Sequence, residues 1–190
     1  MAVTDETVSK FQIVHLQESA EGFKTAFLLL ADSCKNGSWE QRGDVMSVLG
    51  TNGMFAAELY LKLILVIESF NNSTCSGTHP HGHALDFLFN HLSQNAKDAL
   101  RNEFNATNYK NGADLDTFLQ NSSRQFECWR YSYNEGTISF NINTLWDVLC
   151  ILKKYSSNRF ISISQVIAQN GTLAVPNQSI QVFNFDDIYE

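Results

Sequence analysis

One run of apolar residues, "MFAAELYLKLILVI" from Met54 to Ile67, constrains the fold more than any other feature of the chain. Only two charged residues, Glu58 and Lys62, interrupt it. A helix that is apolar nearly all round needs other elements to cover it, so we expect this helix at the centre of a bundle. The run is shorter than the about 20 apolar residues that span a bilayer, and we expect no membrane segment.

Apolar residues at helical spacing predict further helices on both sides of this run. The central helix is predicted from about Val45 to Phe70, after a turn-rich connection at Lys35 to Asp44. Ahead of it, the segment from Val8 to Lys35 also has a helical pattern, with Gly22 as a point where the helix can break or kink. Downstream helices are predicted at 84–92, 94–104, 115–121, 123–133 and 143–158, and a polar loop at 71–82.

The sequence changes character at Phe160. From there "FISISQVIAQNGTLAVPNQSIQVFNF" alternates apolar and polar residues, and Asn170-Gly171 is a hairpin signal. This pattern fits either a small hairpin or an extended tail that packs on the bundle or on a partner chain. The predicted fold class is therefore all-α, with a bundle of four to six helices in residues 1–159 and a β-like or extended tail in residues 160–190.

The charge of the chain bears on its partners. The formal net charge is −7, from 13 basic and 20 acidic residues, so we expect no bulk binding to DNA, which needs clustered Lys and Arg. A small basic patch remains at Lys153, Lys154 and Arg159. The four cysteines form no C-x-x-C pair, and we find no secretory signal, so we expect free thiols in the cytoplasm.

Three histidines, His79, His81 and His83, stand within the stretch "THPHGHALDFLF". Zinc sites commonly draw four ligands from two separated pairs of residues, and the second pair is missing here, although Cys75 and His91 lie near in sequence. We therefore predict no metal site and no cofactor. His79 and His81 are interpreted as loop residues, and His83 as a residue at a helix start that hydrogen-bonds across the bundle.

The charged residues of the central helix need partners. Glu58 and Lys62 are four residues apart with the acid first, the favourable order for an ion pair on a helix. In so apolar a helix at least one of them should be partly buried, and a buried charge requires a partner, for which Arg130 is a candidate. The network either ties the bundle together or lines a cleft.

A second polar group lies in the aromatic segment "FECWRYSYNE", from Phe126 to Glu135. Trp129, Tyr131 and Tyr133 surround Arg130, which could bind a phosphate or carboxylate through two hydrogen bonds while the aromatic rings stack on a base. The alternative is core packing of the aromatic rings, with Arg130 paired to Glu58 or Glu135.

The segments "AAELYLKLIL" (56–65), "GHALDFLFNHL" (82–92) and "FECWRYSYNE" (126–135) follow one another in the chain. In this order they resemble the HEPN domain superfamily (higher eukaryotes and prokaryotes nucleotide-binding). Many of its members have an E-L-x-L-K helix, a G-H-x-L helix start and a late F-x-x-W-R-Y-x-Y-x-E segment. The resemblance covers roughly Val45 to Leu152.

The resemblance implies a bundle of four or five helices, often a homodimer, with roles in prokaryotic defence, toxin–antitoxin or nucleotide-linked systems. Many members are metal-independent ribonucleases that use an R-x(4–6)-H motif. This chain departs from that pattern, because its last histidine is His91 and none follows Arg101, Arg124, Arg130 or Arg159. A serine-hydrolase elbow, P-loop, G-x-G-x-x-G or H-E-x-x-H motif is also absent, so catalysis by those routes is not predicted.

Three hypotheses remain from the sequence. The first is a HEPN-like, dimeric module that binds a nucleotide, RNA or a protein partner and is more readily a binding protein than an enzyme. The second is an atypical ribonuclease that uses a cleft near Arg130, with Tyr131, Tyr133 or His83 as proton donor. The third is a purely structural interaction module. The candidate residues are Glu58, Lys62, His83, Trp129, Arg130, Tyr131, Tyr133 and Glu135.

Overall fold

A computed structural model describes residues 5–36, 39–107, 114–130 and 141–169. Within these residues it contains six helices and two short strands, which confirms the all-α class. The elements are β1 (Asp5–Ser9), α1 (Lys10–Asn36), α2 (Trp39–Glu68), β2 (Ser76–Pro80), α3 (Leu85–His91), α4 (Gln94–Ala106), α5 (Leu115–Arg130) and α6 (Ile142–Gln169).

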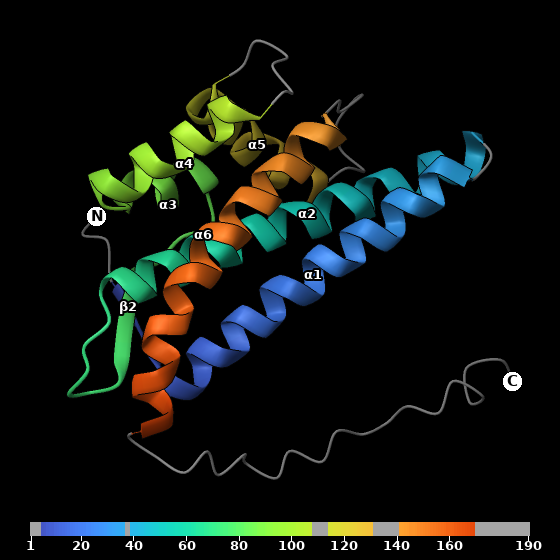
Figure 1. The fold of residues 1–190 in the computed structure, drawn as a ribbon. Helices are drawn as coiled ribbons and strands as arrows, with labels where there is room; N and C mark the ends of the chain where they lie inside the picture. Colours follow the sequence, from blue (N-terminus) through green and yellow to red (C-terminus); the bar gives the residue numbers. More distant parts are fainter. Residues whose placement is uncertain (1–4, 37–38, 108–113, 131–140, 170–190) are drawn as a thin grey trace, which may run out of the picture.

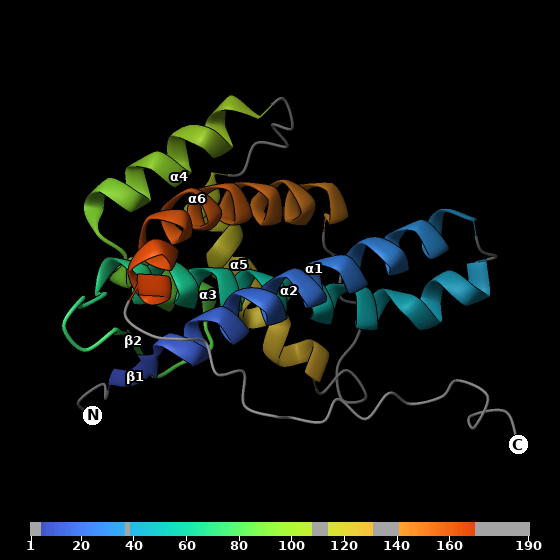
Figure 2. The ribbon, with the colours of Figure 1, turned by 60° about the horizontal axis from the view of Figure 1, so that its bottom comes forward.

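The helices are arranged around α2. The long helices α1 and α2 lie side by side as an antiparallel hairpin, and α6 crosses α2 on another side (Figure 1). Figure 2 shows α4 stacked over α6, and α6 over α2. The short helix α3 and helix α5 pack on each other and on α2. The end of the α1–α2 hairpin extends beyond the other helices (Figures 1 and 2).

The core confirms the prediction for the apolar run. Between Met54 and Val66 almost every side chain of α2 is buried, with α1, α3, α5 and α6 around it. The segment Val45–Glu68 is also long and apolar enough to cross a membrane, but 78% of its most apolar window is buried inside the protein. Its apolar side chains are thus already covered by the bundle, as expected for a core helix.

Glycine within α2 allows a close approach of helices. A Cβ atom on Gly53 would lie 2.6 Å from Leu145 Cδ2 and 2.9 Å from Phe27 Cδ2. The missing side chain therefore lets α1 and α6 pack directly against α2, and the helix continues through Gly53 despite its low helix propensity. By contrast, α1 continues unbroken through Gly22, where a Cβ atom would meet open space.

The predicted polar loop at 71–82 is wrong in part, because Ser76–Pro80 forms β2 and pairs antiparallel with β1. The strand is anchored to the end of α2. The amide of Thr78 donates to Ser69 Oγ at 2.7 Å, and Ser69 Oγ lies 2.9 Å from the Thr78 carbonyl oxygen. A Cβ atom on Gly77 would lie 2.2 Å from the backbone oxygen of Val66, so only glycine fits this contact.

Several helix boundaries also differ from the predictions. Helix α2 begins at Trp39, inside the expected connection, and α5 is one continuous helix over two predicted ones. Helix α6 continues to Gln169, through the start of the expected extended tail. Ile163 is buried, whereas Ile161 is 60% exposed. A strand would place both on one face, so the packing follows the helical period instead.

The rest of the predicted tail, including Asn170-Gly171, lies outside the described residues. The division into residues 1–159 and 160–190 therefore stays a prediction for the part beyond Gln169.

Candidate functional site

The two charged residues of α2 meet a histidine from the start of α3. Lys62 Nζ lies 2.9 Å from Glu58 Oε1, the helical ion pair that the spacing predicts. The same oxygen lies 2.8 Å from Nδ1 of His83. One carboxylate oxygen therefore holds both a lysine from its own helix and an imidazole from a segment 25 residues later.

Glu58 is the buried centre of this network. Its side chain is only 3% exposed, and that of Lys62 is 11% exposed. Its second oxygen, Oε2, is buried and has no hydrogen-bond partner among the described residues. A buried carboxylate oxygen without a partner is costly, so Oε2 is a place where an additional donor would stabilise the network.

His83 is the accessible part of the network, with a side chain that is 53% exposed. A carboxylate accepts hydrogen bonds, so the Nδ1–H group of His83 donates to Glu58. That contact fixes the ring, and Nε2 makes no hydrogen bond within the described residues. An oriented imidazole with an accessible nitrogen can bind an anion when protonated, accept or give a proton, or bind a metal.

The strand pair adds a second imidazole–carboxylate contact beside the first. In the β1–β2 register Glu6 lies directly opposite His79, and the Glu6 carboxylate also contacts Nδ1 of His81. The hydrogen bond from His81 lowers the pKa of Glu6 below its ordinary value, and the charges of His79 and Lys62 act in the same direction. The ring centroids of His81 and His83 are 6.2 Å apart.

The three histidines thus belong to two neighbouring carboxylate groups, His79 and His81 with Glu6 and His83 with Glu58. His79 was expected in a loop but lies in β2, buried, and its Nδ1–H donates to the Pro80 carbonyl oxygen at 3.0 Å. His83 precedes α3, as predicted. Sequence reasoning missed Glu6 because its partners are more than 70 residues away, at positions 79 and 81.

The other predicted site residues are not placed. Residues 131–140 lie outside the described part of the chain, which includes Tyr131, Tyr133 and Glu135. Trp129 and Arg130 lie in the last turn of α5, and their side chains are also outside it. Whether Arg130 pairs with Glu58, or any of these side chains joins the network, stays a prediction.

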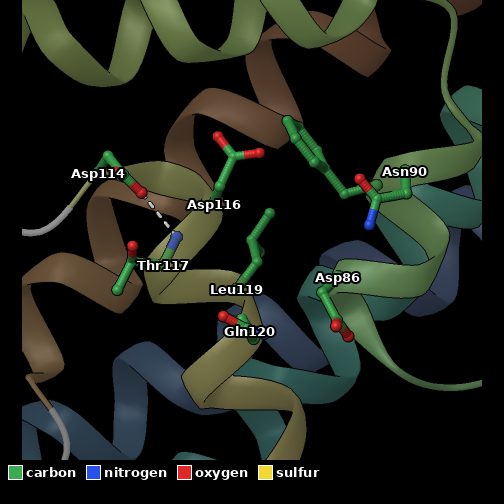
Figure 3. A pocket seen from close by; sticks show the side chains of 8 residues that line it. Asp86, Asn90, Asp114, Asp116, Thr117, Leu119 and Gln120 are labelled. Carbon is green, nitrogen blue, oxygen red and sulfur yellow. Dashed lines mark hydrogen bonds between the residues drawn. The ribbon is translucent and has the colours of Figure 1, made fainter.

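A polar hollow lies apart from these residues, between α3 and the start of α5 (Figure 3). Asp86 lines it from α3, and Asp114 and Asp116 line it from the other side. Two of these carboxylates already have local partners. Asp114 Oδ1 caps α5 by accepting from the Thr117 amide at 2.7 Å, and Asp116 binds Arg101 through both oxygens at 2.7 and 2.8 Å. The arginine lowers the pKa of Asp116.

Two further observations limit the assignment. Within the described residues, no three His, Cys, Asp or Glu side chains are gathered as a complete metal site. No protein-family profile, curated protein or solved structure matches the chain. The candidate site therefore rests on its own geometry.

Proposed function

We propose that this protein is a HEPN-like helical module that binds a nucleotide or RNA through the site formed by Glu58, Lys62 and His83. The observation that supports the proposal most is the contact of 2.8 Å between Glu58 Oε1 and His83 Nδ1. It joins the first two segments of the resemblance, which are separate in the sequence, and leaves the imidazole open to solvent.

The chemistry of the site favours a phosphate group as the part of the ligand that is recognised. The Glu58 carboxylate orients the His83 ring with Nε2 toward no protein partner among the described residues, and an imidazole that carries a proton on Nε2 can donate it to an anion. Lys62 brings a positive charge to the same carboxylate. The chain as a whole is acidic, so recognition by a few placed donors fits better than attraction to a broad basic surface.

An atypical ribonuclease is the second candidate, and the same contact favours it. An imidazole oriented by a buried carboxylate is the arrangement that general acid–base catalysis uses. It would move the proton of a ribose hydroxyl or of a leaving oxygen without an R-x(4–6)-H motif. The third hypothesis, a purely structural network, is opposed by the exposure of His83, since an imidazole that only ties helices together has no need to face solvent.

Titration of a panel of nucleoside mono-, di- and triphosphates and a short single-stranded RNA tests the proposal. Binding is measured by calorimetry for the wild type and for His83→Ala and His91→Ala. His91 is the matched control, because it is also exposed, lies at the other end of α3 from His83 and bonds locally to the Phe87 carbonyl oxygen at 2.8 Å. We expect binding that is lost in His83→Ala and retained in His91→Ala.

Incubating the same proteins with labelled RNA separates binding from cleavage. Cleavage that disappears in His83→Ala but persists in His91→Ala would support the ribonuclease. If no phosphate ligand binds to the folded wild type, the proposal is wrong and the structural hypothesis is favoured. Circular dichroism of each variant confirms that a loss of binding is not a loss of fold.

A further inference from the structure

We propose that His81 and His83 together form an open site for a divalent transition-metal ion of the Zn²⁺, Ni²⁺ or Cu²⁺ class. The site shares His83 with the proposed function but does not depend on nucleotide binding. Both rings stand at the surface, with side chains 64% and 53% exposed. Neither imidazole nitrogen Nε2 has a hydrogen-bond partner among the described residues.

The first argument is the way in which each ring is held. Nδ1 of His81 contacts Glu6, and Nδ1 of His83 contacts Glu58 at 2.8 Å. Histidines that bind metals almost always donate their other ring nitrogen to a carboxylate or a carbonyl, which fixes the ring and makes Nε2 a better donor of electrons. A turn that leads into a helix does not need two neighbouring exposed histidines that are each oriented by a carboxylate. The arrangement therefore favours a binding role.

The second argument is the distance between the rings. With a zinc–nitrogen bond of about 2.0–2.1 Å, two imidazoles on one tetrahedral ion have ring centroids roughly 5 Å apart. The observed separation is 6.2 Å, with the ring planes at 72°. A small tilt of either ring about its carboxylate contact would cover the difference.

The two histidines provide only two ligands, which agrees with the lack of a complete cluster of three in the described residues. The remaining positions on the ion are left to water or to an oxygen of a bound molecule. A site of this kind can bind a phosphate group through the metal. It would also supply local positive charge to a chain with a net charge of −7.

Titration of the full chain with Ni²⁺ or Zn²⁺ alone, without a histidine tag and without nucleotide, tests the inference. We expect one ion per chain, with Cu²⁺ bound more tightly than Ni²⁺ and no comparable binding of Mg²⁺. His81→Ala and His83→Ala should each abolish binding. Glu6→Gln should weaken it about 10-fold by releasing the ring of His81, and His91→Ala should leave it unchanged.

Absence of binding to the wild type would overturn the inference. Metal affinity in His81→Ala equal to that of the wild type would also overturn it. So would a loss of metal affinity in His91→Ala as large as that in His83→Ala, because the ion would then lie elsewhere. Nickel binding without nucleotide binding would support the metal site and contradict the proposed function. Nucleotide binding without metal binding would do the reverse, so the two failures can be distinguished.

Discussion

Asp116 and Glu58 both hold a cation, but they do so in different ways. Asp116 binds Arg101 through both of its oxygens, in a pair that leaves neither oxygen without a contact. Glu58 uses one oxygen for both Lys62 and His83, while its buried second oxygen has no partner in the described part of the chain. The first pair is complete as it stands. The second leaves one oxygen without a partner and reaches solvent through the His83 imidazole, which is why our proposal places the function there.

Removal of the buried carboxylate should have the largest effect. Glu58→Ala leaves Lys62 buried without its charge partner, so we expect the free energy of unfolding to fall by about 3–5 kcal/mol. Urea denaturation measures it. The double variant Glu58→Met with Lys62→Met should recover most of the loss, since a buried ion pair contributes little relative to apolar residues of similar size. Equal instability of the single and double variants would contradict this account of Glu58.

Strand β2, which contains His79 and leads into His81 and His83, should be the next most sensitive. Gly77→Ala places a methyl group against the Val66 backbone, and we expect a loss of about 1–3 kcal/mol of stability together with impaired binding at His83. Gly22→Ala is the matched control, because its Cβ would meet open space within a helix. It should stabilise the protein by about 0.5–1 kcal/mol. Equal effects of the two substitutions in urea denaturation would show that β2 does not pack closely against the Val66 backbone.

The Asp116–Arg101 pair should contribute less to stability than the Glu58–Lys62 pair. Both partners are partly exposed, so Asp116→Asn should cost only about 0.2–1 kcal/mol after screening by solvent. Ligand and metal binding at His83 should not change, which calorimetry can check. A change in binding as large as that of His83→Ala would mean that the hollow between α3 and α5 belongs to the functional site.

The smallest expected effect on stability is the protonation of Glu6 at low pH. The pKa of Glu6 is lowered in the folded state, so its contribution to stability is fully present above the ordinary value of 4.5 and is lost as the pH falls through the lower folded value. The difference in stability between the wild type and Glu6→Gln should therefore shrink on acidification below that value. A carboxyl carbon titration by NMR locates the pKa of Glu6 directly, and a pKa at or above 4.5 would contradict its contact with His81.

Much of the bundle follows from local pattern, whereas the site does not. The run from Met54 to Ile67 predicts a buried central helix because its composition alone requires cover on every side. The Glu58–Lys62 pair follows from helical spacing in the same way. The contact of Glu58 with His83 is nonlocal, and the sequence could only identify His83 as a residue that reaches across the bundle.

The errors have physical causes as well. The alternating pattern after Phe160 was outweighed by packing, because Ile163 and Phe160 face the apolar cluster around Leu63 and Val66 at helical spacing. The segment from Ser76 to Pro80 is polar and short, so it has little strand signal of its own, and its pairing with Asp5 to Ser9 supplies the missing stabilisation. Glu6 could not be found without that pairing.

The register between β1 and β2 also implies an order of assembly. Glu6 and His81 are 75 residues apart, with both long helices between them. Contacts of such high sequence separation close large loops, and they tend to form after local helices have formed and docked. The histidine network should consequently be completed late in folding, and a chain that lacks its first strand could retain the bundle while losing the second imidazole contact. Occupancy of the site would then report on whether β1 is paired with β2.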